Sequence, residues 1–220
     1  MHAAVKRGTD VVVASAALVL LSPALLVVAA AVALSLGRPV LFRQQRPGLH
    51  GIPFTLVKFR SMRDADPTAG LVADADRLTP FGRLLRSTSL DELPSLVGVL
   101  RGDMSLVGPR PLLMHYLPLY DEEQSRRHEV RPGLTGLAQV SGRNALDWQE
   151  RLRLDVSYVD QGSLLLDLRI AARTVAVVAR RSGVTDSGEV TCRPFTGNGP
   201  TRPASPEVAP RSLDRQGSGR

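Results

Sequence analysis

The feature that most constrains the fold is an uncharged apolar stretch near the start of the chain, at residues 11–37. It holds 27 residues rich in Ala, Val and Leu, and charged side chains flank it at Lys6, Arg7, Asp10 and Arg38. A helix of this length would extend about 40 Å, whereas the hydrocarbon core of a bilayer is about 30 Å thick. The stretch therefore predicts a membrane segment that is either tilted or broken.

The middle of this stretch carries a break signal, Ser22-Pro23. Proline has no N–H to donate within a helix, and its ring clashes with the carbonyl four residues earlier, here that of Val19. The Ser22 hydroxyl could take up a backbone group freed at this point. Basic residues lie on both sides, so the positive-inside rule is satisfied if both ends stay cytoplasmic. We predict a re-entrant helix broken at Ser22-Pro23; the alternatives are a Pro-kinked span and a signal peptide, whose apolar region is usually shorter.

The remaining sequence predicts a mainly α fold with one small β-hairpin. Strands are expected at residues 40–45 and 54–60, on either side of a turn that contains Pro47 and Gly48. Helices are expected at four places: just after Thr79-Pro80, and at residues 112–130, 147–159 and 164–180. The helix after Thr79-Pro80 is amphipathic, which suits either a position in the lipid headgroup layer or an ordinary half-buried helix.

Composition divides the chain into three parts and narrows its partners. We expect a membrane helix at 1–37, a globular domain at 38–182 and a disordered tail rich in Pro, Gly, Ser and Arg at 183–220. The formal net charge of +7 favours anionic partners such as phosphates, nucleotides or lipid headgroups. Aromatic residues, at 4%, are too few for the stacking platforms of a single-strand nucleic-acid binder, and the single cysteine, Cys192, rules out an intramolecular disulfide.

The densest group of reactive side chains lies at residues 86–94, where Asp91 and Glu92 follow an arginine. One interpretation is structural, because Ser89-x-x-Glu92 matches a helix capping box. Pro94 fits that interpretation poorly, since it falls beyond the positions whose N–H groups lack a helical partner. If the regular helix starts near Pro94, Asp91 lies at its positive end as an ionised carboxylate that can attack phosphorus, and Glu92 could hold Mg²⁺ on phosphates.

Two later segments could bind phosphate. Pro109 and Pro111 fix the backbone around Arg110, which would point its guanidinium in a defined direction. The glycine-rich segment 131–144 includes Arg143, and backbone amides at glycines can approach a diphosphate closely. The structural alternative for each is a surface turn, and the glycine-rich segment matches neither the Walker nor the dinucleotide-binding motif.

Taken in order, these motifs resemble one family, the bacterial sugar transferases, which are monotopic polyprenyl-phosphate phosphoglycosyl transferases. The resemblance covers residues 5–182 and depends on Lys6-Arg7-x-x-Asp10, the apolar stretch with Ser22-Pro23, and residues 42–48, 58–62, 86–94, 102–111 and 132–143. Ser95 and Gly98 depart from the Gln and Asn that family members often have, which concerns local packing more than chemistry. The chain looks like the minimal form of the family.

The resemblance implies a cytoplasmic catalytic domain on the inner (plasma) membrane, with an Asp-Glu dyad at Asp91 and Glu92. In such enzymes the aspartate attacks the sugar-linked phosphate of a UDP-sugar and releases UMP, and polyprenyl (undecaprenyl) phosphate then takes the phosphosugar. By the same resemblance Glu92 binds Mg²⁺, while Arg86, Arg110 and Arg143 hold phosphates. The implied role is the first membrane step of exopolysaccharide, capsule, O-antigen or glycoconjugate assembly.

The expected partners are thus a UDP-sugar, polyprenyl phosphate and the bilayer, without nucleic acid, and a homo-oligomer stays open. Two alternatives belong to other classes: a membrane-anchored basic protein that binds nucleic acid or anionic lipid, and an inactive relative that only scaffolds glycan assembly. The acidic pair Asp91-Glu92 argues against the first, and the intact dyad with Arg110 argues against the second. No residue pattern identifies the sugar.

Overall fold

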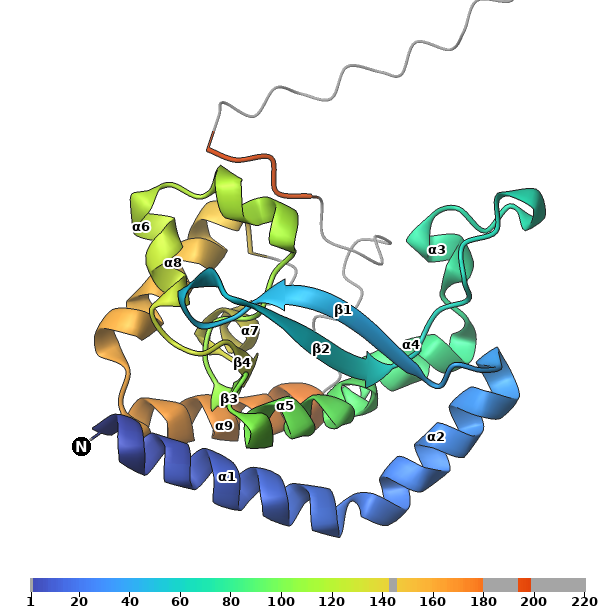
Figure 1. The fold of residues 1–220 in the computed structure, drawn as a ribbon, viewed down its shortest axis with the longest axis horizontal. Helices are drawn as coiled ribbons and strands as arrows, with labels where there is room; N and C mark the ends of the chain where they lie inside the picture. Colours follow the sequence, from blue (N-terminus) through green and yellow to red (C-terminus); the bar gives the residue numbers. More distant parts are fainter. Residues whose placement is uncertain (1, 143–145, 180–193, 199–220) are drawn as a thin grey trace, which may run out of the picture.

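A computed structural model describes residues 2–142, 146–179 and 194–198 of the chain. The fold is mainly helical, with a bent pair of helices along one side and two small two-stranded sheets in the body (Figure 1). The elements, with η for a 3-10 helix, are α1 (His2–Leu20), α2 (Ser22–Leu36), β1 (Leu41–Pro47), η1 (Leu49–Gly51), β2 (Pro53–Phe59), η2 (Pro67–Ala69), α3 (Asp74–Arg77), α4 (Pro80–Ser87), η3 (Leu90–Ser95), α5 (Leu96–Arg101), β3 (Ser105–Val107), η4 (Met114–Leu119), α6 (Glu122–Ser125), η5 (Arg126–His128), β4 (Gly133–Thr135), α7 (Leu137–Ser141), α8 (Trp148–Gln161) and α9 (Leu164–Ala179).

The apolar N-terminal stretch forms two helices, α1 and α2, bent by 63° at Leu21. The Ser22 hydroxyl donates to the Val19 carbonyl at 2.8 Å, and Pro23 lies in the first turn of α2, where a missing N–H leaves no helical bond unmade. The predicted break at Ser22-Pro23 is therefore confirmed. Within the described part of the chain no single helix has the length and hydropathy of a membrane span, whereas this bent pair reaches both together.

Polar contacts fasten both ends of the bent pair to the body. In α1, Lys6 Nζ lies 2.7 Å from the Asp167 carboxylate of α9, and the Arg7 guanidinium donates to the last carbonyls of α5. Further along α1, the Asp10 carboxylate accepts a backbone N–H from β3 at 3.0 Å. At the other end, the Arg60 guanidinium donates to carbonyls at the end of α2, which satisfies groups that a helix terminus leaves unpaired.

The β-hairpin is confirmed, and it faces the core with one side. β1 pairs with β2 antiparallel, from Leu41 opposite Phe59 to Pro47 opposite Pro53. Because side chains alternate along a strand, Phe54 and Leu56 both point inward. The second sheet, a parallel pair of β3 and β4, was not predicted.

Two apolar clusters surround the segment that carries the acidic pair. The first joins α1, β2 and α5 through Ala14, Phe54, Leu56, Leu96, Val99 and Met104. The second joins α2, β2 and α4 through Val28, Val32, Phe59 and Leu85. Leu93 packs on the first cluster and Leu90 on the second, so η3 is held between them.

The later helix predictions had mixed outcomes. Helices α4, α8 and α9 are confirmed close to the expected positions. A single helix over 112–130 is wrong, because this segment splits into η4, α6 and η5. Pro118 lies inside η4, and Asp121 starts a new helix by capping it, since its carboxylate accepts the N–H of Gln124 at 2.8 Å.

Residues 194–198 lie against the body near α6 and α8 (Figure 1). Phe195 is only 3% exposed and packs against the rings of Tyr116 and Trp148. Asn198 exchanges side-chain hydrogen bonds with α6 and α8. These five residues of the predicted tail are held against the body, and the rest of it, at 183–193 and 199–220, falls outside the described residues.

We expect Phe195→Ala to lower the free energy of unfolding by about 3–5 kcal/mol, because it removes a buried aromatic side chain and leaves a cavity. Denaturant or thermal unfolding of the purified chain measures this loss. Thr196→Ala is the matched control, since Thr196 is the exposed neighbour in the same segment. Equal stabilities for the two variants would contradict the role of Phe195 as an anchor.

Candidate active site

The acidic pair lies on η3, a short 3-10 turn between α4 and α5. Ser89, just before it, has a φ of 57°, in the left-handed region that residues other than glycine rarely adopt. Its side chain makes no capping hydrogen bond, so the capping-box interpretation of Ser89 and Glu92 is wrong. The regular helix α5 starts at Leu96 rather than near Pro94, and Asp91 therefore lies within the 3-10 turn instead of at the end of an α-helix.

A buried serine fastens this turn to the hairpin. Ser95 is 2% exposed, and its hydroxyl donates to the Val57 carbonyl of β2 at 2.7 Å. Because Ser95 ends η3 and Val57 precedes Lys58, the contact also fixes the turn next to the lysine that meets the acidic pair. The serine at this position is thus accounted for by local packing.

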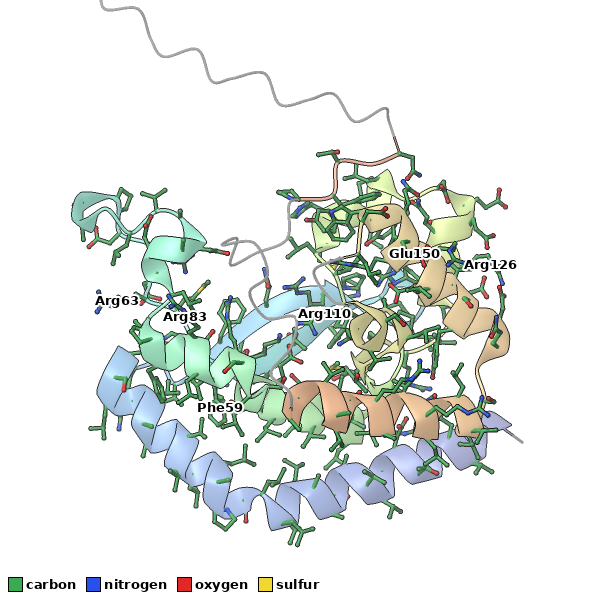
Figure 2. All side chains as sticks on the ribbon, turned by 180° about the vertical axis from the view of Figure 1, so that it is seen from behind. Phe59, Arg63, Arg83, Arg110, Arg126 and Glu150 are labelled. Carbon is green, nitrogen blue, oxygen red and sulfur yellow. The ribbon has the colours of Figure 1, made fainter. Side chains whose placement is uncertain are left out.

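Glu92 forms ion pairs with two cations from different segments of the chain. Its Oε1 lies 2.6 Å from Lys58 Nζ of β2 and 2.7 Å from Arg110 Nη2. Figure 2 shows Arg110 near the middle of the molecule next to the hairpin, whereas Arg63 and Arg126 lie at its periphery. The structure therefore brings together Glu92 and Arg110, which the sequence singled out separately, and adds Lys58.

The two carboxyls of the pair have opposite electrostatic environments. Burial, and to a smaller extent the neighbouring Glu92, raise the pKa of Asp91 to about 6 against the lowering effect of Lys58, Arg86 and Arg110. Burial also acts to raise the pKa of Glu92, but Arg110 and Lys58 outweigh it and hold that pKa well below the usual range. Glu92 is thus a fixed anion, while Asp91 titrates close to neutrality.

The Asp91 side chain is 7% exposed, yet no hydrogen bond within the described parts of the chain involves its carboxylate. Ionised above about pH 6, it is available as a nucleophile.

Arg86 lies on α4, close to the acidic pair. Its Nε donates to the Ser61 hydroxyl at 3.0 Å, and Asp91 is the strongest opposite charge acting on its pKa, which burial lowers. Gly82 allows α4 to come this close, because a Cβ there would overlap the Ser61 carbonyl. Arg86 is thus positioned beside Asp91 without an ion pair at contact distance.

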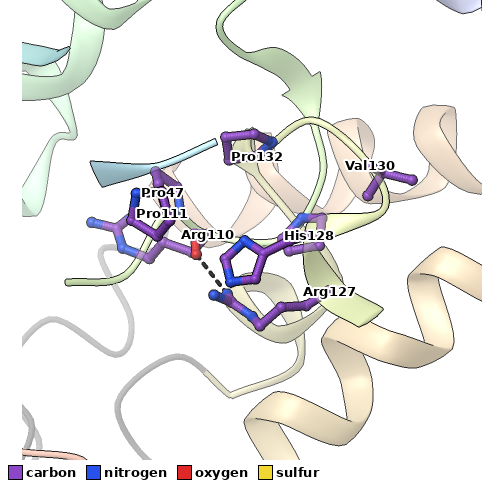
Figure 3. Close-up of a pocket in the computed structure, with 8 residues that line it drawn as sticks. Pro47, Arg110, Pro111, Arg127, His128, Val130 and Pro132 are labelled. Atoms are coloured by element: carbon purple, nitrogen blue, oxygen red, sulfur yellow. Dashed lines mark hydrogen bonds between the residues drawn. The ribbon is translucent and has the colours of Figure 1, made fainter. Parts of the chain in front are cut away.

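A hydrogen bond from Arg127 holds the backbone of Arg110 in place. The Arg127 guanidinium donates to the Arg110 carbonyl at 2.6 Å, and Pro111 lies beside this contact (Figure 3). Arg127 also pairs with Asp155 at 2.7 Å, and the two side chains are 1% and 2% exposed. The prolines and this buried pair together direct the Arg110 side chain toward Glu92, as the sequence predicted for the prolines.

The remaining predicted residue, Arg143, falls outside the described residues. Lys58 is a site residue to which the sequence assigned no role, although it belongs to the motif at 58–62. A lysine on the inward-facing side of a short strand was the available signal, because such a charge requires a partner.

The carboxylates of the site can be compared with those that Mg²⁺ requires. No three His, Cys, Asp or Glu side chains within the described ranges are grouped so that they could hold a metal ion. Mg²⁺ usually binds one or two carboxylates together with substrate phosphates and water, which does not require such a group. Both ion pairs of Glu92 use Oε1, and no hydrogen bond in the described part of the chain uses Oε2. The residues fit Mg²⁺ in that shared mode, with Glu92 as the protein ligand.

The chain is similar to known proteins over most of its length. Positions 1–181 match the family model for bacterial sugar transferases. The uncharacterised sugar transferase EpsL of Bacillus subtilis is 53% identical over 195 residues, which is 88% of this chain and 96% of that protein. A UDP-glucose:undecaprenyl-phosphate glucose-1-phosphate transferase of Caulobacter vibrioides is 45% identical over 77% of this chain and 68% of its own. An undecaprenyl-phosphate galactose phosphotransferase of Salmonella typhimurium is 39% identical over 81% of this chain and 41% of its own.

Proposed function

The chain belongs to the bacterial sugar transferase family and is a phosphoglycosyl transferase, and from this premise we propose that it transfers a sugar-1-phosphate from a UDP-sugar to polyprenyl phosphate, with release of UMP. The observation that carries the proposal is the buried Asp91 carboxylate, unengaged by its described neighbours, next to a glutamate held by two cations. This arrangement suits an anionic substrate and a carboxylate nucleophile.

The proposed reaction has two displacements at the same phosphorus. In the first, an Asp91 oxygen bonds to the phosphorus that carries the sugar, and the phosphoanhydride bond to UMP breaks, so UMP leaves with the electron pair. In the second, a phosphate oxygen of the polyprenyl phosphate attacks that phosphorus, and the bond to Asp91 breaks. The carboxylate is regenerated, and the soluble donor departs before the lipid acceptor reacts.

The chain's own residues hold charge around these steps. Lys58 and Arg110 keep Glu92 ionised, and Arg86 lies close enough to offset the negative charge of Asp91. Mg²⁺, bound by Glu92 together with substrate phosphates, would supply positive charge to the leaving phosphate. We assign phosphate binding to Arg86, Arg110 and Arg143, as the resemblance implies.

We further propose that α1 and α2 enter the cytoplasmic leaflet of the inner membrane as a re-entrant hairpin. Support comes from the apolar side chains exposed on their outer surface: Val12, Val19, Leu20, Leu26, Val27 and Leu34. An exposed apolar surface of this kind suits lipid contact. Tags at the two ends should be labelled from the cytoplasmic side only, and a C-terminal tag labelled from outside would refute the hairpin.

The central experiment measures UMP release by the full chain in nanodiscs, with Mg²⁺, across a panel of UDP-sugars, with and without undecaprenyl phosphate. Repeated turnover that needs both the lipid and one donor would establish the reaction and identify the sugar. The panel must be broad, because one relative is named a glucose-1-phosphate transferase and another a galactose phosphotransferase. Absence of release with every donor and the lipid would contradict the proposal.

The rate of UMP release should fall as the pH drops through about 6. Asp91 must be ionised to attack, and its pKa of about 6 places protonation in this range. Above pH 7 the rate should be nearly constant, because Asp91 is then mostly ionised and Glu92 remains charged throughout. The initial rate measured between pH 5 and 8 tests this, and a flat profile across pH 5 to 7 would contradict the assignment of Asp91 as the titrating group.

A further inference from the structure

A small cavity of about 70 Å³ lies beside the acidic pair. Its lining includes three cationic side chains and one carboxylate. The cations are Arg46, Lys58 and Arg110, and the carboxylate is Glu92. Three cations therefore share a space with one anion. This excess of positive charge is the arrangement expected of a site that receives an anion.

The three cations differ in how they are satisfied. Lys58 and Arg110 both bond to Glu92 Oε1, at 2.6 and 2.7 Å. Arg46 has a neutral acceptor instead, because its Nη2 donates to the Gln44 side-chain oxygen at 2.6 Å. Its Nε is buried and finds no acceptor within the described ranges. A charged donor without an acceptor is costly to bury, so this N–H points to a missing ligand.

The position of Arg46 also brings two like charges together. Burial, and after it the nearby charge of Arg110, lower the pKa of Arg46 to about 10. No carboxylate forms an ion pair with Arg46 in the described part of the chain. An anion placed between these two guanidiniums would relieve their repulsion and satisfy the free N–H.

We propose that Arg46 binds a phosphate group of the substrate in this cavity, together with Arg110. The proposal rests on the proposed function, and it adds a residue to the site that neither the dyad nor the predicted arginines include. A guanidinium suits this task because its planar fork can donate two parallel hydrogen bonds to phosphate oxygens. The phosphate could belong to the UDP-sugar or to the polyprenyl phosphate, and the experiment separates the two.

The test compares Arg46→Gln with Arg43→Gln in the full chain in nanodiscs. Arg43 is the matched control, because it lies on the same strand but is exposed. In a two-displacement reaction, kcat/KM for the donor and for the lipid report the two half-reactions separately. We expect Arg46→Gln to lower kcat/KM by about 10- to 100-fold for the substrate whose phosphate it binds, since hydrogen bonds to charged groups are worth this much. The Arg43 variant should stay close to the unmodified chain.

A second readout does not depend on turnover. Calorimetric titration with inorganic pyrophosphate should show weaker binding to Arg46→Gln than to Arg43→Gln, with matching thermal unfolding temperatures for the two variants. Equal pyrophosphate affinities, or an equal loss in both half-reactions with unchanged pyrophosphate binding, would overturn the inference. If the unmodified chain releases no UMP from any donor, the proposed reaction fails, and the pyrophosphate titration still decides the role of Arg46.

Discussion

Asp91→Asn is expected to abolish UMP release, by about 10⁴-fold or more, while leaving the thermal unfolding temperature unchanged or raised. An amide cannot form the acyl-phosphate bond that the proposed reaction requires. The same change removes a buried charge that burial and Glu92 both disfavour, which is why its pKa is raised to about 6. Loss of activity without loss of stability is the expected signature of a residue kept for chemistry.

Glu92→Gln is the matched comparison, because it also removes one negative charge from the neighbouring position. It should lower the free energy of unfolding by about 1–3 kcal/mol, since Lys58 and Arg110 lose their shared anion. UMP release and thermal unfolding, measured on both variants in nanodiscs, give the comparison. Substantial turnover by Asp91→Asn would remove Asp91 as the nucleophile, whatever Glu92→Gln does.

Arg127→Met is expected to lower the free energy of unfolding by about 3–5 kcal/mol, together with a loss of activity. The change leaves Asp155 as an unpaired carboxyl that is 2% exposed, and it removes the donor to the Arg110 carbonyl. Denaturant unfolding measures the first effect, and kcat/KM for the UDP-sugar measures the second.

The double variant Arg127→Met with Asp155→Leu separates the two effects. Replacing both partners of a buried pair by apolar side chains often restores stability, because no uncompensated charge remains. The Arg110 carbonyl still lacks its donor, so activity should stay low while stability recovers. Full recovery of activity in the double variant would show that Arg127 acts only on stability and not on the placement of Arg110.

The predictions that the structure confirmed depend on local signals. A proline in the interior of a helix interrupts it, so the break at Pro23 was visible in the sequence. The turn residues between the two strands likewise predicted the hairpin. The prolines around Arg110 restricted its backbone, and the side chain does reach a defined partner, Glu92.

The predictions that failed depend on partners far along the chain. A capping box is recognised from local spacing, whereas Glu92 bonds to cations 34 and 18 positions away. Lys58 received no role for the same reason, because its partner lies outside its strand. The β3–β4 sheet has strands of three residues each, too short to show an alternating pattern. Phe195 lay in a segment of low-complexity composition, where a single buried ring leaves no periodic signal.

Polar contacts at both ends of the bent helix pair fix its position on the body of the molecule. Lys6 and Asp10 bind the first half of α1 to the body, and Arg60 binds the end of α2, whereas the bend at Leu21 makes no polar contact with the body in the described part of the chain. The pair and the η3 turn also pack on the same two apolar clusters, which fixes the position of the bend relative to Asp91. If the pair enters a bilayer as proposed, its depth would fix the level of the Asp91 carboxylate relative to the membrane surface. The phosphate of a lipid would then have to reach that level to react.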